Sequence, residues 1–131
     1  MTHAGSCLCG AVRFEIEGEF ERFYLCHCDH CRKGTGSAHG ANLFSTSARL
    51  TWLAGEDKAT LFRLLDTRHH KCFCSICGSA LPIAKDGMVV APAGSLDRAM
   101  AMRPTAHIFT ASRAAWDDGL ETVPAFERYP A

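Results

Sequence analysis

The stretch FCSICGS, residues 73–79, decides the fold because it places two cysteines on one C-x-x-C turn. Tetrahedral zinc takes four ligands, with thiolate sulfurs about 2.3 Å from the metal, and such a turn brings two sulfurs close enough to share one ion. Gly78 follows the second cysteine and suits the tight backbone that the turn needs. Cys74 and Cys77 therefore supply half of a metal site.

A second cysteine pair lies near the start of the chain, in CLCG at residues 7–10. When C-x-C lies on a strand, both side chains leave the same face, so Cys7 and Cys9 can chelate one ion. We expect this pair to complete the site with Cys74 and Cys77, about 65 residues later. A closed four-cysteine zinc site of this kind is structural, because it removes chain entropy by joining distant segments.

The richest cluster is YLCHCDHCRKGTG, residues 24–36, which contains Cys26, Cys28 and Cys31. A strand end that runs into a turn can hold a second zinc ion on these three thiolates. Catalytic zinc typically keeps three protein ligands and an open fourth position, whereas structural zinc is closed. Two interpretations stay open: the site is open for chemistry, or it is closed by a fourth protein ligand, for which the candidates are Cys72, His27, His30 and His39.

Some of these residues also have ordinary structural interpretations. His27 alternates with the cysteines, so on a strand it points away from the metal. His30 is expected to face solvent, and His69, His70 and Lys71 are expected in an exposed turn. Cys72 is expected to be a spare buried thiol that lies beside the metal-binding segments.

The rest of the chain has a mostly extended pattern. AVRFEIEG, residues 11–18, alternates apolar and charged side chains with the period of a half-buried strand. Residues 59–65 fit a strand or a helical turn, and residues 96–103 fit a short helix that Pro104 ends. The sequence thus predicts one mainly antiparallel β domain over residues 1–131, with further strands in segments 37–45, 50–55, 88–96 and 105–112.

Composition narrows the class of protein. A chain of 131 residues is expected to be one domain, and 14 basic against 14 acidic residues leave no electrostatic footprint for nucleic acid. No apolar run approaches the ~20 residues that cross a bilayer, and the first residues lack the pattern of a secretory signal. We therefore expect a cytoplasmic protein, in which eight reduced cysteines bind metal, with a disulfide framework as the alternative.

The order and spacing of these motifs resemble one known family. CLCG, CHCDHCRKGTG and FCSICGS, followed by AGSLD, SRAAW and PAFERYP, look like the glutathione-dependent formaldehyde-activating enzyme family, whose domain is shared with centromere protein V. The resemblance implies a β-tent fold, in which two zinc ions per chain pin antiparallel sheets. It places the structural zinc on Cys7, Cys9, Cys74 and Cys77, and the second zinc on Cys26, Cys28 and Cys31 with a place for an exogenous thiol.

The activity that the resemblance implies is that of a zinc-dependent carbon–sulfur lyase similar to S-(hydroxymethyl)glutathione synthase. Formaldehyde or a related small aldehyde would add to glutathione or another thiol at the three-cysteine zinc, with Cys26, Cys28 and Cys31 as the catalytic site. Arg32 and Lys33 are the nearest cations for the carboxylates of glutathione, or else belong to a solvated turn. The alternative function is a non-catalytic binding module with two structural metals, and a homodimer is one candidate for the assembly.

Overall fold

The strands of the computed structural model, which describes residues 1–130, form three sheets. The first has the order β1-β2-β5, from β1 (Thr2–Ser6), β2 (Arg13–Glu17) and β5 (Arg49–Ala54). The second has the order β11-β3-β4-β10-β9, from β3 (Arg22–Cys26), β4 (Gly40–Ser45), β9 (Ile83–Lys85), β10 (Met88–Pro92) and β11 (Ala106–Ile108). The third joins β6 (Ala59–Arg63), β7 (His70–Cys74) and β8 (Ala80–Leu81).

All strand pairs in these sheets are antiparallel except β11, which runs parallel to β3 with Ile108 opposite Cys26. The prediction of a mainly antiparallel β protein is confirmed. The parallel pair matters for the site, because it brings the chain after residue 105 to the end of β3, where the middle cysteine motif begins.

Helical structure is short. The α-helix α1 covers Asp29–Thr35, and five 3₁₀ turns follow along the chain: η1 (Glu56–Lys58), η2 (Ala93–Ser95), η3 (Thr110–Ser112), η4 (Ala115–Asp117) and η5 (Leu120–Thr122). Cys28 caps α1, since its sulfur accepts a hydrogen bond from the backbone N–H of Cys31 at 3.3 Å. Within residues 1–130, no helix has the length and apolar character that a membrane span requires.

The strand predicted at 11–18 is confirmed as β2, whose Phe14 and Ile16 are fully buried while its charged residues face outward. Residues 59–63 form strand β6, which decides between the two interpretations of that segment. The helix proposed for 96–103 is wrong. Met100 and Met102 both pack on the core, and this spacing of two suits an extended chain better than a helix.

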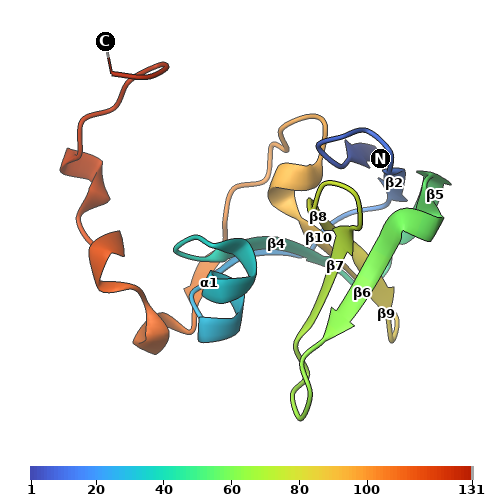
Figure 1. Ribbon diagram of the computed structural model, residues 1–131, viewed down its shortest axis with the longest axis horizontal. Coiled ribbons are helices and arrows are strands. Elements are labelled where there is room, and N and C mark those ends of the chain that lie inside the picture. Colours follow the sequence, from blue (N-terminus) through green and yellow to red (C-terminus); the bar gives the residue numbers. More distant parts are fainter. Residues whose placement is uncertain (131) are drawn as a thin grey trace.

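The core lies where the three sheets meet. Fully buried side chains come from each region, including Phe14 and Ile16 on β2, Leu43 on β4 and Cys74 on β7. Figure 1 shows the sheets gathered in one body, while the chain beyond β11 runs outward from it past α1. The two ends of the molecule are therefore different in kind: a packed body and an extended C-terminal segment.

Gly5 sits where the first sheet packs most closely. It pairs with Phe14 on β2, and a Cβ at this position would lie 2.1 Å from the Phe14 ring. We expect Gly5→Ala to destabilise the protein by about 1–3 kcal/mol, because a fully buried ring has to move. Gly94→Ala is the matched control, since nothing lies within 4 Å of its added Cβ. Equal urea midpoints for the two variants would contradict this expectation.

Candidate metal centres

The first cysteine cluster joins the turn between β1 and β2 to the turn between β7 and β8. The sulfurs of Cys7 and Cys9 lie 3.6 Å apart, and those of Cys9 and Cys74 lie 3.9 Å apart. With Cys77, all four sulfurs lie within 4.8 Å of one another. Four thiols at these separations form a donor set that fits a tetrahedral metal ion, and thiolates favour zinc and other soft metals.

The local backbone explains how each pair is held. Cys7 and Cys9 were expected on a strand but lie on a turn, in which the Gly10 N–H donates to the Cys7 carbonyl at 3.1 Å. The second pair follows its prediction: Gly78 has a φ of 76°, which favours glycine, and its N–H donates to the Cys74 carbonyl at 2.7 Å. One turn belongs to the first sheet and the other to the third sheet, and the cysteine sulfurs of the two turns face each other.

The proton affinities of these thiols show how strongly they interact. Hydrogen bonds from the Ser79 hydroxyl and backbone, together with one from the Cys9 backbone, lower the pKa of Cys77 to about 5. At Cys9 a backbone hydrogen bond from Ala11 lowers the pKa, but burial and the neighbouring thiols raise it to about 11. Four sulfurs this close cannot all carry negative charge without a cation between them, which a divalent metal provides.

The second cluster contains Cys26, Cys28 and Cys31, whose sulfurs lie within 4.8 Å of one another. Cys26 ends β3, Cys28 caps α1 and Cys31 lies in its first turn, so a strand end and a short helix hold the three thiols. Strand β4 backs the cluster at Gly40, where an added Cβ would lie 3.5 Å from the Cys31 sulfur. The donor set again fits a soft metal ion.

No fourth side chain completes this cluster among residues 1–130: neither Cys72 nor any histidine nitrogen or carboxylate joins the three sulfurs. Burial raises the pKa of Cys31, and the Cys26 and Cys28 thiols beside it raise that pKa further. At Cys28 burial also raises the pKa, but hydrogen bonds from Cys31 and Cys26 outweigh it and the pKa is lowered. The geometry is that of a three-thiol site with one side free.

A cavity of about 140 Å³ opens beside this cluster. Cys31 forms one part of its wall, and β7 forms another through Lys71 and the buried Cys72. The Lys71 ammonium donates to the Gly34 carbonyl and so ties β7 to α1. Cys72 thus shares a cavity with a cluster cysteine without belonging to the cluster, and burial raises the pKa of its thiol.

A groove of about 640 Å³ continues from the cavity, since Cys31, His69 and His70 line both. Its walls carry three cations, Arg63 from the end of β6, Arg68 from the following loop and Lys85 on β9, against one carboxylate, Asp86. The groove is therefore basic, and it leads directly to the three-thiol cluster.

The two cations that the sequence pointed to lie elsewhere. Arg32 donates to the Asp29 carboxylate at 2.6 Å, and neither Arg32 nor Lys33 lines the cavity or the groove. Their role in substrate binding stays a prediction. Sequence reasoning missed the cations of the groove and took His69, His70 and Lys71 for an exposed turn. The only sequence signal for His69, His70 and Lys71 was their position just before Cys72. This position does not show which part of the fold their side chains face.

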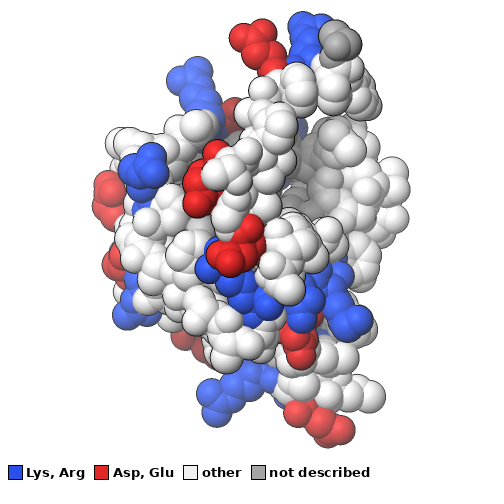
Figure 2. All heavy atoms as spheres, turned by 90° about the vertical axis from the view of Figure 1, so that its left-hand side faces the viewer, with Lys and Arg blue, Asp and Glu red and all other residues white. Residues whose placement is uncertain are grey.

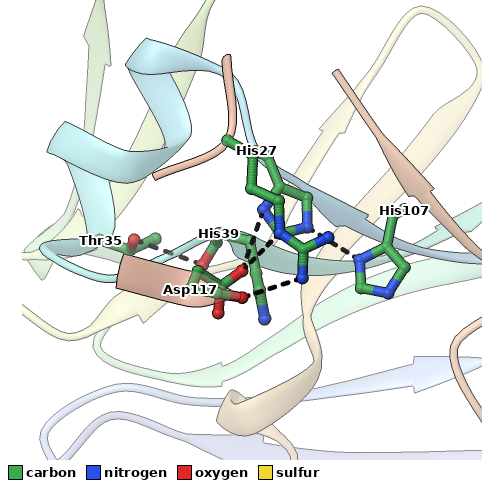
Figure 3. A network of polar contacts seen from close by, with 6 residues as sticks. His27, Thr35, His39, His107 and Asp117 are labelled. Carbon is green, nitrogen blue, oxygen red and sulfur yellow. Dashed lines mark hydrogen bonds and ion pairs between the residues drawn. The ribbon is translucent and has the colours of Figure 1, made fainter. Parts of the chain in front are cut away.

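A network of polar contacts surrounds the buried His27, which lies between Cys26 and Cys28 of the second cluster (Figure 3). His27 is fully buried between two cluster cysteines, and a 2.8 Å hydrogen bond joins its Nε2 atom and Nδ1 of His107. Its other nitrogen lies 3.6 Å from the carboxylate of Asp117, which accepts a 3.1 Å hydrogen bond from Arg113. Burial, reinforced by the nearby His39 and His107, lowers the pKa of His27, so its ring is neutral at pH 7.

This network fastens the C-terminal segment to the motif that carries the cluster. His27 does not join the three sulfurs of the cluster, and Figure 3 shows its ring turned toward Asp117. His30 is exposed, as expected, but it also lines the cavity. The Nδ1 atom of His39 is buried without a hydrogen-bond partner among the described residues. The His39 ring packs against that of His27, with 5.1 Å between the two ring centroids.

We expect Asp117→Ala to destabilise the protein by about 1–3 kcal/mol, because Arg113 loses its acceptor and the wall around the buried His27 is opened. Asp118→Ala is the control: the neighbouring carboxylate is exposed and its loss should change stability by less than about 0.5 kcal/mol. Urea unfolding followed by circular dichroism separates the two variants. An Asp117→Ala protein as stable as the control would show that the network does not contribute to the free energy of unfolding.

Comparison with known proteins gives one consistent result. A family model described as glutathione-dependent formaldehyde-activating enzyme matches residues 2–112. A Halomonas elongata protein, named as a candidate glutathione-dependent formaldehyde-activating enzyme, is 34% identical over 82 residues, covering 59% of this chain and 52% of that protein. The chain thus spans about half the length of this relative. A Rhodobacter sphaeroides crystal structure shares the fold, with a TM-score of 0.58 at 22% identity over 82% of this chain and 99% of that one.

Proposed function

The chain belongs to the glutathione-dependent formaldehyde-activating enzyme family, and from this membership we propose that it is a zinc-dependent carbon–sulfur lyase that joins formaldehyde and glutathione. One observation carries the proposal: three thiols lie within 4.8 Å of one another beside a cavity, with no fourth ligand among residues 1–130. The proposal includes zinc at both clusters and one β-tent domain that the four-cysteine cluster pins.

The reaction makes one bond and moves one proton. The thiol sulfur of glutathione bonds to the carbon of formaldehyde, the carbonyl π bond breaks, and the thiol proton ends on the new hydroxyl group. A free thiol with a pKa near 8.5 is mostly protonated at pH 7, so the supply of thiolate limits the rate. Zinc, when bound, supplies the positive charge that lowers the pKa of a thiol beside it. Cys26, Cys28 and Cys31 would hold the metal and leave one side of it facing the cavity.

The chain offers an acceptor for the thiol proton in the same cavity. His69 lines the wall near α1, with its Nε2 atom 3.9 Å from the position of a Cβ at Gly34. Burial lowers the pKa of His69, and the neighbouring His30, His70 and Lys71 lower it further. His69 is therefore neutral at pH 7 and able to accept a proton.

We expect His69→Gln to lower kcat/KM for the addition by about a hundredfold, the low end of general-base effects. Because the pKa of His69 lies below 6.5, protonation of its ring below that pH should add a further fall to the wild-type rate, beyond the loss of glutathione thiolate that every variant shares. The variant should lose this further fall. Rates measured from pH 5 to 8, with the no-protein rate subtracted, check both points. An unchanged pH profile in the variant would exclude His69 as the acceptor.

The basic groove fits the remaining groups of glutathione. Glutathione carries two carboxylates, and Arg63 and Arg68 provide guanidinium groups that pair with carboxylates in a bidentate manner. Lys85 adds a third cation, and its ammonium lies 3.0 Å from His70 Nε2. We propose that the peptide lies along this groove with its thiol at the end beside Cys31.

The proposed function is tested by NMR exchange spectroscopy on formaldehyde, glutathione and their adduct, with and without the zinc-loaded protein. The uncatalysed reaction is appreciable, so the result is the ratio of the two exchange rates. We expect clear acceleration with glutathione and much less with 2-mercaptoethanol, which lacks the carboxylates. No acceleration of either thiol, with two zinc ions bound per chain, would support a binding module with two structural metals.

A further inference from the structure

The C-terminal segment, residues 109–130, is anchored to the body at the buried Asp117 but extends away from it beyond that residue. Figure 1 shows it running outward from the body past α1. The hydrogen bonds described for residues 118–130 close within the segment, as from Val123 N–H to the Leu120 carbonyl at 3.1 Å. It nevertheless carries six large apolar side chains that are 44% to 93% exposed: Phe109, Trp116, Leu120, Val123, Phe126 and Tyr129.

This exposure is as large as, or larger than, the largest apolar patch on a typical monomer. Each aromatic side chain can bury about 150–250 Å², so the four aromatic residues alone present on the order of 400–700 Å² to solvent. The largest apolar patch on a typical monomer is about 300–600 Å². The segment has only three-residue 3₁₀ turns, which do not hold a shape by themselves. Its conformation therefore depends on a surface that covers it.

The direction of the segment is fixed at its root. Arg113 bonds both the carboxylate and the carbonyl of Asp117, and the buried Asp117 faces His27 of the body. Immediately beyond this anchor, Gly119 turns the chain with a φ of 64°. Figure 2 looks onto this side of the molecule and shows a hollow between the outer part of the segment and the body. The anchor thus holds the apolar side chains away from their own body.

We propose that this segment packs against a second copy of the chain, in a two-fold dimer in which each segment enters the hollow of its partner. A standard protein interface buries about 800 Å² on each partner. The apolar area of one segment supplies a large part of that, and a two-fold dimer makes the contact between segment and hollow twice, once in each direction. An apolar, aromatic-rich surface also has the composition that homodimer interfaces show at their core.

The proposal concerns the assembly and is independent of the proposed chemistry, because residues 118–130 do not line the cavity or the groove. It adds one structural consequence. The root of each segment contacts His27, which lies between two cluster cysteines in the sequence. The dimer would therefore hold the C-terminal segment against the residues behind the second cluster.

The test is sedimentation velocity on the full, zinc-loaded chain from about 1 to 50 µM. We expect wild-type protein to sediment as a dimer, and the double variant Val123→Asp and Phe126→Asp to dissociate at least a hundredfold more readily. Both side chains are exposed in the single chain, so the variant should fold and keep its metal. Leu65→Asp is the control: its side chain is 83% exposed in the hairpin loop after β6, and it should stay dimeric.

A second readout uses Trp116, which is 64% exposed in the single chain. In a Trp52→Phe background it is the only tryptophan, and its emission should shift to the red as the dimer is diluted. Wild-type protein that sediments as one chain at 50 µM would overturn the proposal, whether its segment folds onto its own body or awaits a different protein. Assemblies that keep growing with concentration would overturn the two-fold arrangement.

Discussion

Cys74→Ser is expected to leave the chain largely unfolded at 25 °C. The Cys74 side chain is fully buried, and its sulfur lies 3.9 Å from that of Cys9, so it helps to join the first and third sheets. Structural zinc contributes about 10–16 kcal/mol of binding energy in zinc-finger peptides, which is as large as the whole stability of a typical domain, about 5–15 kcal/mol. Losing one of four ligands forfeits most of that energy.

The same strand supplies the control. Cys72 is also buried on β7, two residues earlier, but its sulfur belongs to neither cluster. Cys72→Ser should cost only the burial of a hydroxyl group, about 1–3 kcal/mol, and leave the metal content unchanged. Urea unfolding by circular dichroism, with metal analysis of the purified proteins, compares the two. A Cys74→Ser protein with a wild-type midpoint and two metal ions per chain would show that the first cluster does not hold the fold.

The cysteine spacing carried most of what could be predicted. A C-x-x-C turn fixes the distance between its two sulfurs locally, so Cys74 and Cys77 could be paired from sequence. The partner pair at Cys7 and Cys9 followed from counting ligands, even though its backbone is a turn and not a strand. A short-range motif is readable because its geometry depends on few neighbours.

The remaining features depend on contacts between distant segments. The alternation of β2 reports its own burial, but nothing near Arg63 or Arg68 in the sequence shows that they face the groove beside Cys31. The contact between His27 and Asp117 joins residues 90 positions apart through the parallel pairing of β11 with β3. Such a pairing has no local signature, so the basic groove and the anchored C-terminal segment appear only in the folded chain.

Cys28→Ser is expected to abolish the catalysed exchange while the protein stays folded. Cys28 is both a cluster thiol and the residue that caps α1, where its sulfur accepts from the Cys31 N–H at 3.3 Å. Serine is among the preferred caps of helices, so the substitution keeps the cap and removes only the thiolate. The metal content should fall from two ions per chain to one, and the acceleration over the no-protein rate should drop by at least about a hundredfold, which corresponds to about 2.7 kcal/mol.

The variant separates the two interpretations of the second cluster that the sequence left open. If three thiols hold the metal beside the cavity, Cys28→Ser loses the second metal and the activity together, while Cys72→Ser keeps both. If Cys72 moves to close the site when metal binds, Cys72→Ser should lose the second metal as well, and the site would be a second structural one. A Cys28→Ser protein that accelerates the exchange like wild type would place the chemistry outside this cluster. Measuring metal and rate on the same samples makes each outcome distinct, because folding, metal binding and turnover then fail separately.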